Sequence, residues 1–382
     1  MKNSSILIIL IAAILIAAAW MQSGRPIQAA PMPGAPKGSK AAPVLPVGKP
    51  VRIKAPLGLP PISVPSNNPP TAETISLGKR LYYDPILSVD GTVSCATCHG
   101  PAHGFTDNKP VANGVQGKTG TRSSPTVINS AYNKLQFWDG RAPSLEKQAE
   151  GPIANPVEMG HTLDGAVKAL LADENYRKAF QNAWGTDHIT IDLVTKSIAS
   201  FENTVLSGNS PFDRYYYGGD KKALSASARR GLRVFQDAKK GNCAACHTID
   251  KKYALFTDNK FHNIGAGVDI SSNLADAGRF VVTKDDADTG AFKTPTLRNI
   301  AQTAPYMHDG SLKSLKDVID HYIGGGSSNA HLDKQIRALD FLTGQERQDL
   351  EEFLKSLTGK LPPDVGPPSE LQKTSAKLQS RK

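Results

Sequence analysis

The chain has 382 residues, of which 39% are hydrophobic and 27 are prolines, and its formal net charge is +10. This length and composition predict a globular protein of two domains with irregular segments. A basic chain can bind nucleic acid, but here the excess positive charge lies near the two ends, without interleaved aromatic residues. That distribution argues against a nucleic-acid partner.

The N-terminus predicts export. Lys2 precedes an unbroken apolar run from Ile6 to Met21, and Ile27 and Ala29 fit the −3 and −1 positions of a signal-peptidase site. Because this run is shorter than the ~20 residues that usually span a membrane, residues 1–30 are predicted to be a cleaved signal peptide, with an uncleaved anchor as the alternative. We therefore expect a periplasmic protein.

Two low-complexity segments flank the expected domains. Residues 31–70 are rich in proline, carry only basic charges and lack apolar periodicity, which predicts an extended, solvated linker or membrane tether. Residues 361–382 are predicted to be a disordered tail.

The four cysteines of the chain lie in two C-x-x-C-H motifs. These are Cys95, Cys98, His99 and Cys243, Cys246, His247. Paired cysteines can also form disulfides or bind zinc, but a bridge across a two-residue gap is strained, and zinc knuckles lie closer together in sequence. A histidine directly after the second cysteine instead predicts covalent heme c, with both thiols on the vinyl groups and the histidine on the iron. Two heme c groups are expected.

The repetition extends beyond the heme signature. "GKRLYYD" (78–84) precedes the first motif and "GLRVFQD" (231–237) precedes the second, which indicates an internal duplication. Leu81 and Val234 are predicted to lie on the packing face of a helix leading into each heme turn. We predict a mainly α-helical fold of two cytochrome c-like domains, residues 71–222 and 223–360, that share an interface.

Four further segments resemble one enzyme family. They are "FWDGRAPSLEKQAEGPIANPVEMG" (137–160), "FTDNKFHNIG" (256–265), "FKTPTLRN" (292–299) and "TAPYMHDGSLKSL" (303–315). The chain resembles the bacterial di-heme cytochrome c peroxidases and their relative MauG, which matures a tryptophan-derived quinone, over roughly residues 78–357. The resemblance implies a first heme that reacts with peroxide and a second heme that transfers electrons.

The resemblance also implies catalytic residues. The inter-heme tryptophan of the family corresponds to Trp138, its distal-pocket glutamine to Gln148, its acid/base glutamate to Glu158 and its pocket proline to Pro152. Cleavage of the O–O bond of peroxide requires a proton to move from the inner to the outer oxygen. One carboxylate near an open iron can move this proton, and an amide can orient the peroxide.

One position departs from the peroxidase branch. The histidine that caps the first heme in that branch aligns with Val115, which cannot ligate iron. The first heme is therefore expected to be open in every redox state. His103 is the nearest other histidine, and it is expected to pack against the heme edge or hydrogen-bond to it.

The distal ligand of the second heme has two candidates. The methionine of the family aligns with Tyr322, where MauG has a tyrosine, and helical phase places Tyr322 on the same face as Leu315 and Ile319. Met307 is the competing ligand, and a second heme with another ligand or none remains a third alternative. A phenolate would lower the reduction potential of this heme, whereas a thioether would raise it.

Two further features are implied by the resemblance. The calcium site of the family would use Ser123, in place of an asparagine, and the backbone carbonyls of Thr303 and Pro305. Arg298 would pair with a heme propionate. The alternative is a surface arginine after a turn, which could not be distinguished from it by sequence.

These observations predict an exported di-heme peroxidase that reduces hydrogen peroxide with electrons from a small periplasmic c-type cytochrome or cupredoxin. The alternatives are a MauG-like enzyme that oxidises a side chain of a protein substrate, and a non-catalytic electron carrier. The sequence leaves open whether the protein forms a homodimer.

Overall fold

The computed structural model describes residues 44–369 and 371. The predicted signal peptide and the first part of the linker lie outside these residues. Within the described part of the chain, no helix combines the length and hydrophobicity needed to cross a membrane. Most regular structure is helical and the only named sheet is a two-stranded one, so the mainly α-helical class is confirmed among these residues.

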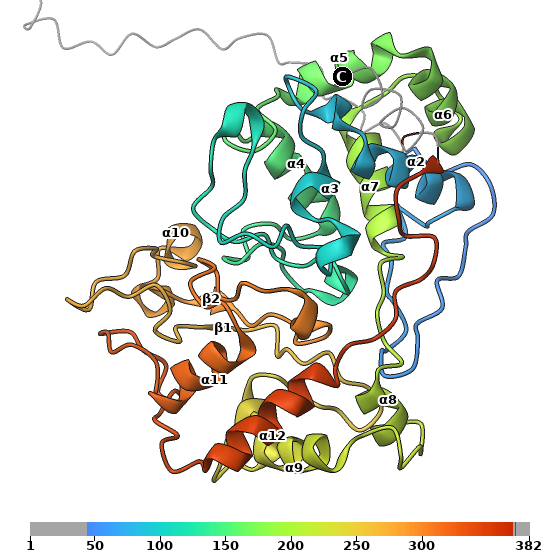
Figure 1. Ribbon diagram of the computed structural model, residues 1–382. Coiled ribbons are helices and arrows are strands. Elements are labelled where there is room, and N and C mark those ends of the chain that lie inside the picture. The colour runs from blue at the N-terminus through green and yellow to red at the C-terminus, as the bar shows by residue number, and fades with distance from the viewer. Residues whose placement is uncertain (1–43, 370, 372–382) are drawn as a thin grey trace, which may run out of the picture. The chain divides into compact units, whose positions relative to one another are not determined.

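The N-terminal half is a helical domain around the first C-x-x-C-H motif (Figure 1). Its α-helices are α2 (Ala72–Tyr83), α3 (Cys95–Cys98), α4 (Leu145–Ala154), α5 (Leu163–Ala172), α6 (Glu174–Trp184), α7 (Ile191–Glu202) and α8 (Pro211–Tyr216). Short 3₁₀ helices are η1 (Pro85–Leu87), η2 (Pro101–His103), η3 (Val115–Gly117) and η4 (Ser130–Tyr132).

The C-terminal half surrounds the second motif in the same manner. It contains α9 (Ala226–Gln236), α10 (Phe280–Thr283), α11 (Leu315–Ile323) and α12 (Gly344–Lys355), with η5 (Cys243–Ala245), η6 (Asp286–Asp288) and η7 (Ile300–Gln302). The antiparallel strands β1 (Phe261–His262) and β2 (Phe292–Lys293) pair Phe261 with Lys293.

The repeated glycine of the predicted duplication has a packing role in both domains. Gly78 of α2 crosses α7 so closely that an added Cβ would lie 1.7 Å from the carbonyl oxygen of Ser197. Gly231 of α9 crosses α12 in the same way, and its Cβ would lie 1.9 Å from the carbonyl oxygen of Asp349. Because any side chain would push the helices apart, both helix pairs depend on glycine at this position.

The two domains meet through a pair of equivalent backbone hydrogen bonds. The Ser123 N–H donates to the His308 carbonyl at 2.7 Å, and the Lys293 N–H donates to the Trp138 carbonyl at 2.8 Å. Ser123 and Lys293 precede the similar segments "SPT" and "TPT", while Trp138 and His308 precede the two "DG" turns. The internal duplication therefore produces matching contacts on both sides of the interface.

An arginine reinforces this interface. The Arg122 guanidinium donates to Asp139 of its own domain at 2.6 Å and forms a two-pronged ion pair with Asp276 of the other domain at 2.6 and 2.9 Å. Arg122 also lies over the ring of Phe292, which stacks on His308 at a centroid distance of 3.7 Å. Bidentate arginine pairs of this kind fix geometry as well as contributing energy.

The division into two cores falls earlier than the predicted boundary between residues 222 and 223. Val205 belongs to the first core, whereas Phe212 of α8 is already part of the second. The Phe212 N–H also donates to the carbonyl of Ser356 just after α12 at 3.2 Å. Helix α8 therefore packs with the C-terminal domain, as Figure 1 also shows.

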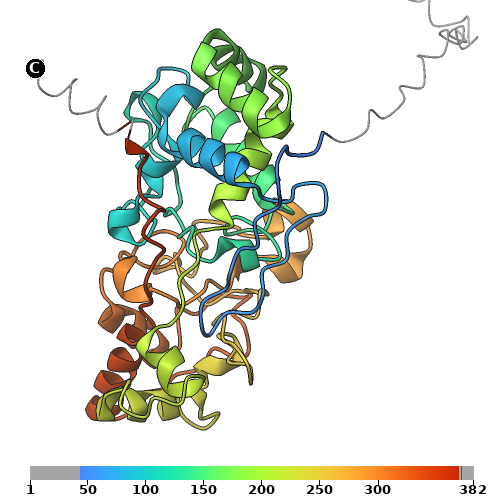
Figure 2. The same ribbon diagram turned by 90° about the vertical axis from the view of Figure 1, so that its right-hand side faces the viewer.

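The described part of the proline-rich linker, residues 44–70, contacts the folded domains at several points, although more than half of its residues are exposed. It runs along both domains (blue in Figure 2). The carbonyl of Gly58 accepts a hydrogen bond from the N–H of Ala254 at 3.0 Å, and Asn68 is buried against Lys196 and Glu146. Proline removes donors but leaves carbonyls free to accept, which is why this segment binds the folded domains without secondary structure.

The start of the predicted tail is also packed. The carbonyl of Val365 accepts from the Tyr83 hydroxyl at 2.7 Å, and the Val365 side chain belongs to the first core. Lys79 of α2 donates to the Asp364 carbonyl at 2.5 Å. Residues 361–366 therefore return to the N-terminal domain, and the prediction of disorder from residue 361 onward is wrong for these residues.

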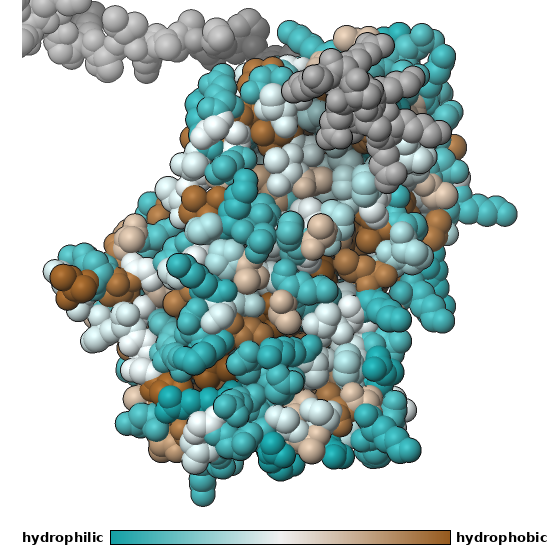
Figure 3. All heavy atoms as spheres, viewed as in Figure 1, coloured by the Kyte–Doolittle hydropathy of each residue, from teal (hydrophilic) through white to brown (hydrophobic). Residues whose placement is uncertain are grey.

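The described surface is mixed in polarity. Figure 3 shows apolar residues scattered over one face, with a small apolar group projecting at the left edge of the view. The exposed large apolar side chains include Ile270 in the loop before α10, and Val281 and Val282 within it. Scattered exposure of this kind is ordinary for a globular protein.

Candidate functional site

The first C-x-x-C-H motif forms a short helix with a defined orientation. The N–H of Ser94 donates to the Thr97 hydroxyl at 3.0 Å, and the N–H of His99 donates to the carbonyl of Cys95 at 2.9 Å. The Tyr82 hydroxyl of α2 then fixes the His99 carbonyl at 2.8 Å. The Nδ1 atom of His99 is buried, and no hydrogen bond of normal geometry to it is found in the described chain.

The second motif orients its histidine through a backbone carbonyl. His247 Nδ1 lies 2.9 Å from the Phe256 carbonyl oxygen, which can only accept. Nδ1 therefore carries the proton, and Nε2 is left with a free lone pair for a metal. Burial lowers the pKa of both His99 and His247, which favours the neutral form that binds iron.

The four thiols also suit covalent heme. All four cysteines are free, and Cys95 and Cys243 each lie against the core of their own domain. Burial raises the pKa of Cys98 to about 11 and that of Cys243 to about 12, so both thiols are neutral at physiological pH. Each domain therefore offers two thiols and a histidine that fit one heme c, and the orientation of the ring is fixed by a hydrogen bond in His247.

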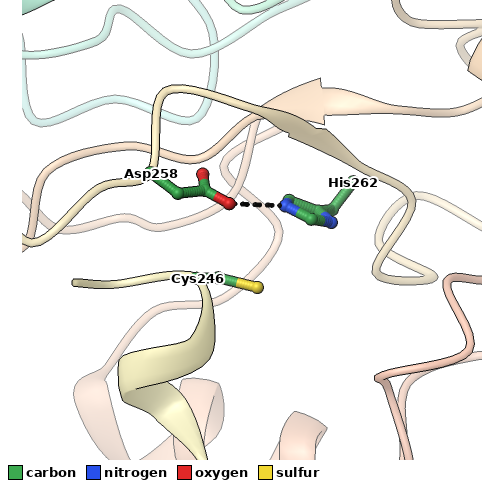
Figure 4. A group of neighbouring side chains, drawn as sticks. All are labelled: Cys246, Asp258 and His262. Atoms are coloured by element: carbon green, nitrogen blue, oxygen red, sulfur yellow. Dashed lines mark hydrogen bonds and ion pairs between the residues drawn. The ribbon is translucent and has the colours of Figure 1, made fainter.

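One cluster in the described chain resembles a metal site. Cys246, Asp258 and His262 bring ligand atoms within 4.8 Å of one another (Figure 4). The pKa of His262 is raised to about 10, first by Cys246 and then by Asp333 and Asp258. Because Cys246 belongs to the heme signature, its sulfur would be a thioether, and the His262 ring would remain held between two carboxylates. This cluster is therefore better explained as part of the heme surroundings than as a separate metal site.

Glu158 lies in the turn after α4, where its carboxylate is close to the first motif. The Asn155 amide donates to Glu158 Oε1 at 2.7 Å. Burial raises the pKa of Glu158, while Asn155 and Arg141 oppose the rise. Burial also raises the pKa of the Cys95 and Cys98 thiols, and the Glu158 carboxylate adds to the rise in both. A carboxyl group with a raised pKa beside the heme attachment point suits proton transfer.

Val115 lies directly beside this glutamate. Its N–H donates to the Glu158 carbonyl at 2.8 Å, and its side chain is only 1% exposed. The position that aligns with the capping histidine is thus an apolar side chain packed into the first core beside the Glu158 backbone. His103, the other histidine considered, is exposed at the end of η2, and its expected contact with the heme edge stays a prediction.

Gln148 and Pro152 belong to helix α4, which begins after the N-cap Ser144 and carries both on the turns before Glu158. Gln148 is half-buried. The Pro152 carbonyl accepts from the N–H of Met159 at 3.1 Å, which folds the Glu158 turn back onto the helix. The structure therefore connects these residues through one short helix and its C-terminal turn.

Trp138 lies at the contact between the two domains. Its indole N–H donates to the Ser123 carbonyl at 2.8 Å, while its own carbonyl accepts from Lys293 of the other domain. Trp138 is thus hydrogen-bonded to both domains. The predicted role in electron transfer between hemes stays a prediction, and this position is compatible with it.

Tyr322 and Met307 differ in their relation to the second motif. Burial raises the pKa of Tyr322, and Cys243 and Cys246 are the next causes, so its phenol lies close to both cysteines. In the described chain, nothing hydrogen-bonds to its hydroxyl. Met307 is half-buried in the loop before α11, with a φ of 72°. The position of Tyr322 favours it as the ligand, and the assignment stays a prediction.

Arg298 is placed differently from expectation. It is 1% exposed, which excludes a surface arginine, and its guanidinium is held by Asp213 at 2.8 and 2.9 Å. It also donates to the carbonyls of Ala254 and Gly58. These four hydrogen bonds make Arg298 a structural link between α8, the linker and the second domain, and they count against the predicted propionate contact.

The predicted calcium ligands stay untested. Ser123 is buried, and its backbone already bonds to His308 and Trp138. Thr303 directs its hydroxyl to the carbonyl of Ile300 at 3.2 Å. Pro305 is half-buried after a cis peptide bond.

Several residues of the site were missed by the sequence reasoning. Asn155 could have been predicted to lie in a turn, because asparagine side chains often accept from the backbone two residues on, as Asn155 does from the N–H of Val157 at 3.1 Å. Tyr82 and Arg141 had no local signal, since their contacts with His99 and Glu158 depend on how distant segments pack.

Comparisons with known proteins agree with this site. The family model described as di-haem cytochrome c peroxidase matches residues 72–222, and a cytochrome c model matches residues 228–358. The chain is 40% identical to the methylamine utilization protein MauG of Methylophilus methylotrophus, over 78% of this chain and 86% of that protein. It is 37% identical to the cytochrome c551 peroxidase of Nitrosomonas europaea, over 77% of this chain and 82% of that protein.

Among solved structures, a MauG-like protein associated with microbial copper homeostasis superposes with a TM-score of 0.72 at 33% identity. The match covers 80% of this chain and 95% of that one. Sequence and fold thus lead to one assignment, with one covalent heme c in each domain. The chain belongs to the di-heme cytochrome c peroxidase and MauG family.

Proposed function

We propose that this protein reduces hydrogen peroxide to water at the first heme, with Glu158 as the group that moves the proton. The overall reaction consumes two protons and two electrons per peroxide and yields two molecules of water. The observation that supports it most is the position of Glu158, a half-buried carboxyl with a raised pKa close to both Cys95 and Cys98. A non-catalytic carrier would have no need of such a group.

The bound heme supplies an iron that binds peroxide and accepts or gives electrons. The protein's own residues handle the protons. Glu158 accepts the proton from the inner oxygen of peroxide and returns it to the outer oxygen, and the Asn155 amide keeps the carboxylate in place at 2.7 Å. Gln148 orients the substrate through its amide, which does not compete for the proton.

Electrons would reach this site from the second heme through Trp138. In support, Trp138 is hydrogen-bonded to both domains where they meet. The donor to the second heme would be a small exported c-type cytochrome or cupredoxin. Such a partner requires the periplasmic location that the N-terminal sequence predicts, with either a cleaved signal peptide or an uncleaved anchor.

A second candidate function is MauG-like oxidation of a side chain on a protein substrate. Two observations favour it: Val115 stands where the peroxidase branch has its capping histidine, and Tyr322 lies beside both cysteines of the second motif. A first heme without a protein cap would react before any reduction. A phenolate on the second heme would favour its ferric state and slow electron supply from an ordinary donor.

The test of the proposed function is Glu158→Gln. The variant keeps the size and polarity of the side chain but cannot shuttle a proton, so steady-state peroxide turnover should fall by about 10² to 10⁴ with normal heme content. Glu150→Gln is the matched control, because that residue lies on α4 and pairs only with the surface Lys147. If turnover in Glu158→Gln falls by less than about threefold, the effect is far below that of an acid/base group, and Glu158 has no place in the mechanism.

A panel of donors separates the two candidate functions. Fast turnover with small c-type cytochromes or cupredoxins supports the peroxidase. Slow turnover with all of them, together with peroxide-dependent oxidation of a co-purified protein, supports the MauG-like activity. A protein whose heme spectrum does not respond to peroxide at all would be an electron carrier.

A further inference from the structure

Lys293 is a buried cation without a protein anion. Three basic side chains are buried in the described part of the chain, and two of them have a carboxylate: Lys196 pairs with Asp192, and Arg298 with Asp213, both at 2.8 Å. Lys293 is only 9% exposed, and no described carboxylate lies within ion-pair distance of its ammonium group. It is therefore the exception among the buried basic residues.

Burial of an unpaired ammonium group is costly, because the charge loses its hydration and gains nothing in return. Burial is the sole cause that lowers the pKa of Lys293, to about 8, and no acidic neighbour offsets it. A lysine in such a place indicates a counter-anion that the described part of the polypeptide does not provide.

The neighbours of Lys293 show which anion is within reach. Lys293 ends β2, and two residues later the backbone of Pro295 contributes to the surroundings of His247. The Thr257 hydroxyl, next to the carbonyl that orients His247, donates to the Thr294 carbonyl at 2.6 Å. The segment from Lys293 to Pro295 therefore passes the second heme site on the side where His247 lies.

Each heme c carries two propionate carboxylates besides its two thioether bonds. Arg298, the residue expected to bind one of them, is held by Asp213 and two carbonyls. We propose that Lys293 is the ionic partner of a propionate of the heme attached at Cys243 and Cys246. This proposal depends on the heme attachment alone, so it stands or falls separately from the proposed function.

The internal duplication makes this contact specific to one heme. The residue equivalent to Lys293 in the first domain is Ser123, which is neutral, and the two backbones make matching bonds across the interface. A cation beside one propionate favours the reduced state of that heme, because the ferric form carries one more positive charge. Lys293 therefore makes the second heme easier to reduce than it would be with a neutral residue at this position.

The test compares Lys293→Met, Lys293→Arg and the exposed control Lys313→Met by spectroelectrochemical titration of both hemes in the holoprotein. In Lys293→Met, the ferric-to-ferrous equilibrium of the second heme should move about tenfold toward ferric, or about 59 mV for one electron. In Lys293→Arg and Lys313→Met, the ferric-to-ferrous equilibrium of the second heme should stay within about threefold of the wild-type value. This margin is well below the effect of one nearby charge. Resonance Raman bands of the propionates should change in Lys293→Met alone.

Two results would overturn the proposal. One is a second-heme potential in Lys293→Met that equals the wild-type value at normal heme content, and the other is a shift confined to the first heme. If Lys293→Met does not retain heme, the Lys293→Arg variant provides the test of the propionate contact. Normal heme content and potential in the arginine variant support a charge contact, whereas loss of heme in both variants would show that Lys293 only fills space.

Discussion

Glu158 is half-buried and Glu202 is buried near the first heme motif, and their neighbours differ. The Glu158 carboxylate has the Asn155 amide and the Arg141 charge to stabilise its ionised form. Glu202 is 5% exposed and makes no side-chain hydrogen bond within the described chain, and the charged group that acts on it is another glutamate, Glu146. Burial and then Glu146 raise the pKa of Glu202 from 4.5 to about 8.

This difference predicts a pH dependence of stability. Because the folded state holds the Glu202 proton more tightly than the unfolded state, the stability that this proton confers is complete below pH 4.5. It is lost as the pH rises toward 8. Glu202→Gln should remove the loss, so that at pH 9 the variant is more stable than the wild type by at most about 5 kcal/mol. Urea denaturation at pH 5, 7 and 9 measures the effect.

Glu174→Gln is the control for this experiment, since Glu174 is an exposed glutamate of α6 paired with Lys178. Its stability should follow the wild type at each pH. If Glu202→Gln and the wild type lose stability in parallel between pH 5 and pH 9, then Glu202 is ionised in the folded protein, and the account of its burial is wrong.

Helices α4 and α11 show how duplicated elements acquire different functions. Each begins at a leucine after an N-cap serine, Ser144 or Ser314, and each follows a "DG" turn. The eighth residue is Pro152 in α4 and Tyr322 in α11. A proline cannot ligate iron and a tyrosine can, so this one position would separate an open first heme from a closed second heme if Tyr322 is the ligand.

Helix α11 carries a direct prediction about ligation of the second heme. If Tyr322 is the ligand, Tyr322→Phe should change the low-spin signal of the oxidised protein and raise the reduction potential of this heme, because a phenolate stabilises ferric iron. Met307→Leu should leave both nearly unchanged. Electron paramagnetic resonance of the two variants checks this. The opposite pattern, with a thioether-to-iron charge-transfer band in the wild-type ferric spectrum, would assign Met307.

At the scale of the whole molecule, local motifs were predictable and long-range contacts were not. The two C-x-x-C-H motifs and the helices starting near Gly78 and Gly231 have local signals, because covalent heme chemistry and helical periodicity depend on neighbouring residues. The contact of Arg298 with Asp213, 85 residues away, has no such signal. Lys293 was likewise unremarkable in sequence, since its burial depends on the closed fold.

The segments that join the domains were the least predictable part. Residues 44–70 read as a solvated linker because proline is their most frequent residue and their charges are all basic, and composition does not reveal that Gly58 supplies a carbonyl to Arg298. The tail residues 361–366 have too few apolar residues to predict packing, yet Val365 enters the first core. A backbone carbonyl makes the contact in the linker and a single apolar side chain makes it in the tail, and neither produces a periodic pattern in the sequence.

The two domains together support an account in which the first heme is open to peroxide before any electron arrives. Val115, buried beside Glu158, cannot cap an iron, and the carboxylate that we propose to move the proton is already in place. On this account, reduction of the second heme is not needed to release a ligand. The peroxidase branch of the family, which has a histidine at this position, would require that step.

The most direct test is to mix the fully oxidised holoprotein with hydrogen peroxide, without a reductant, and to record heme absorption by stopped flow. The account predicts an immediate spectral change at the first heme, slowed by about 10² to 10⁴ in Glu158→Gln. A spectrum that stays unchanged until the protein has been partly reduced would contradict it, because some residue of this chain would then close the first heme.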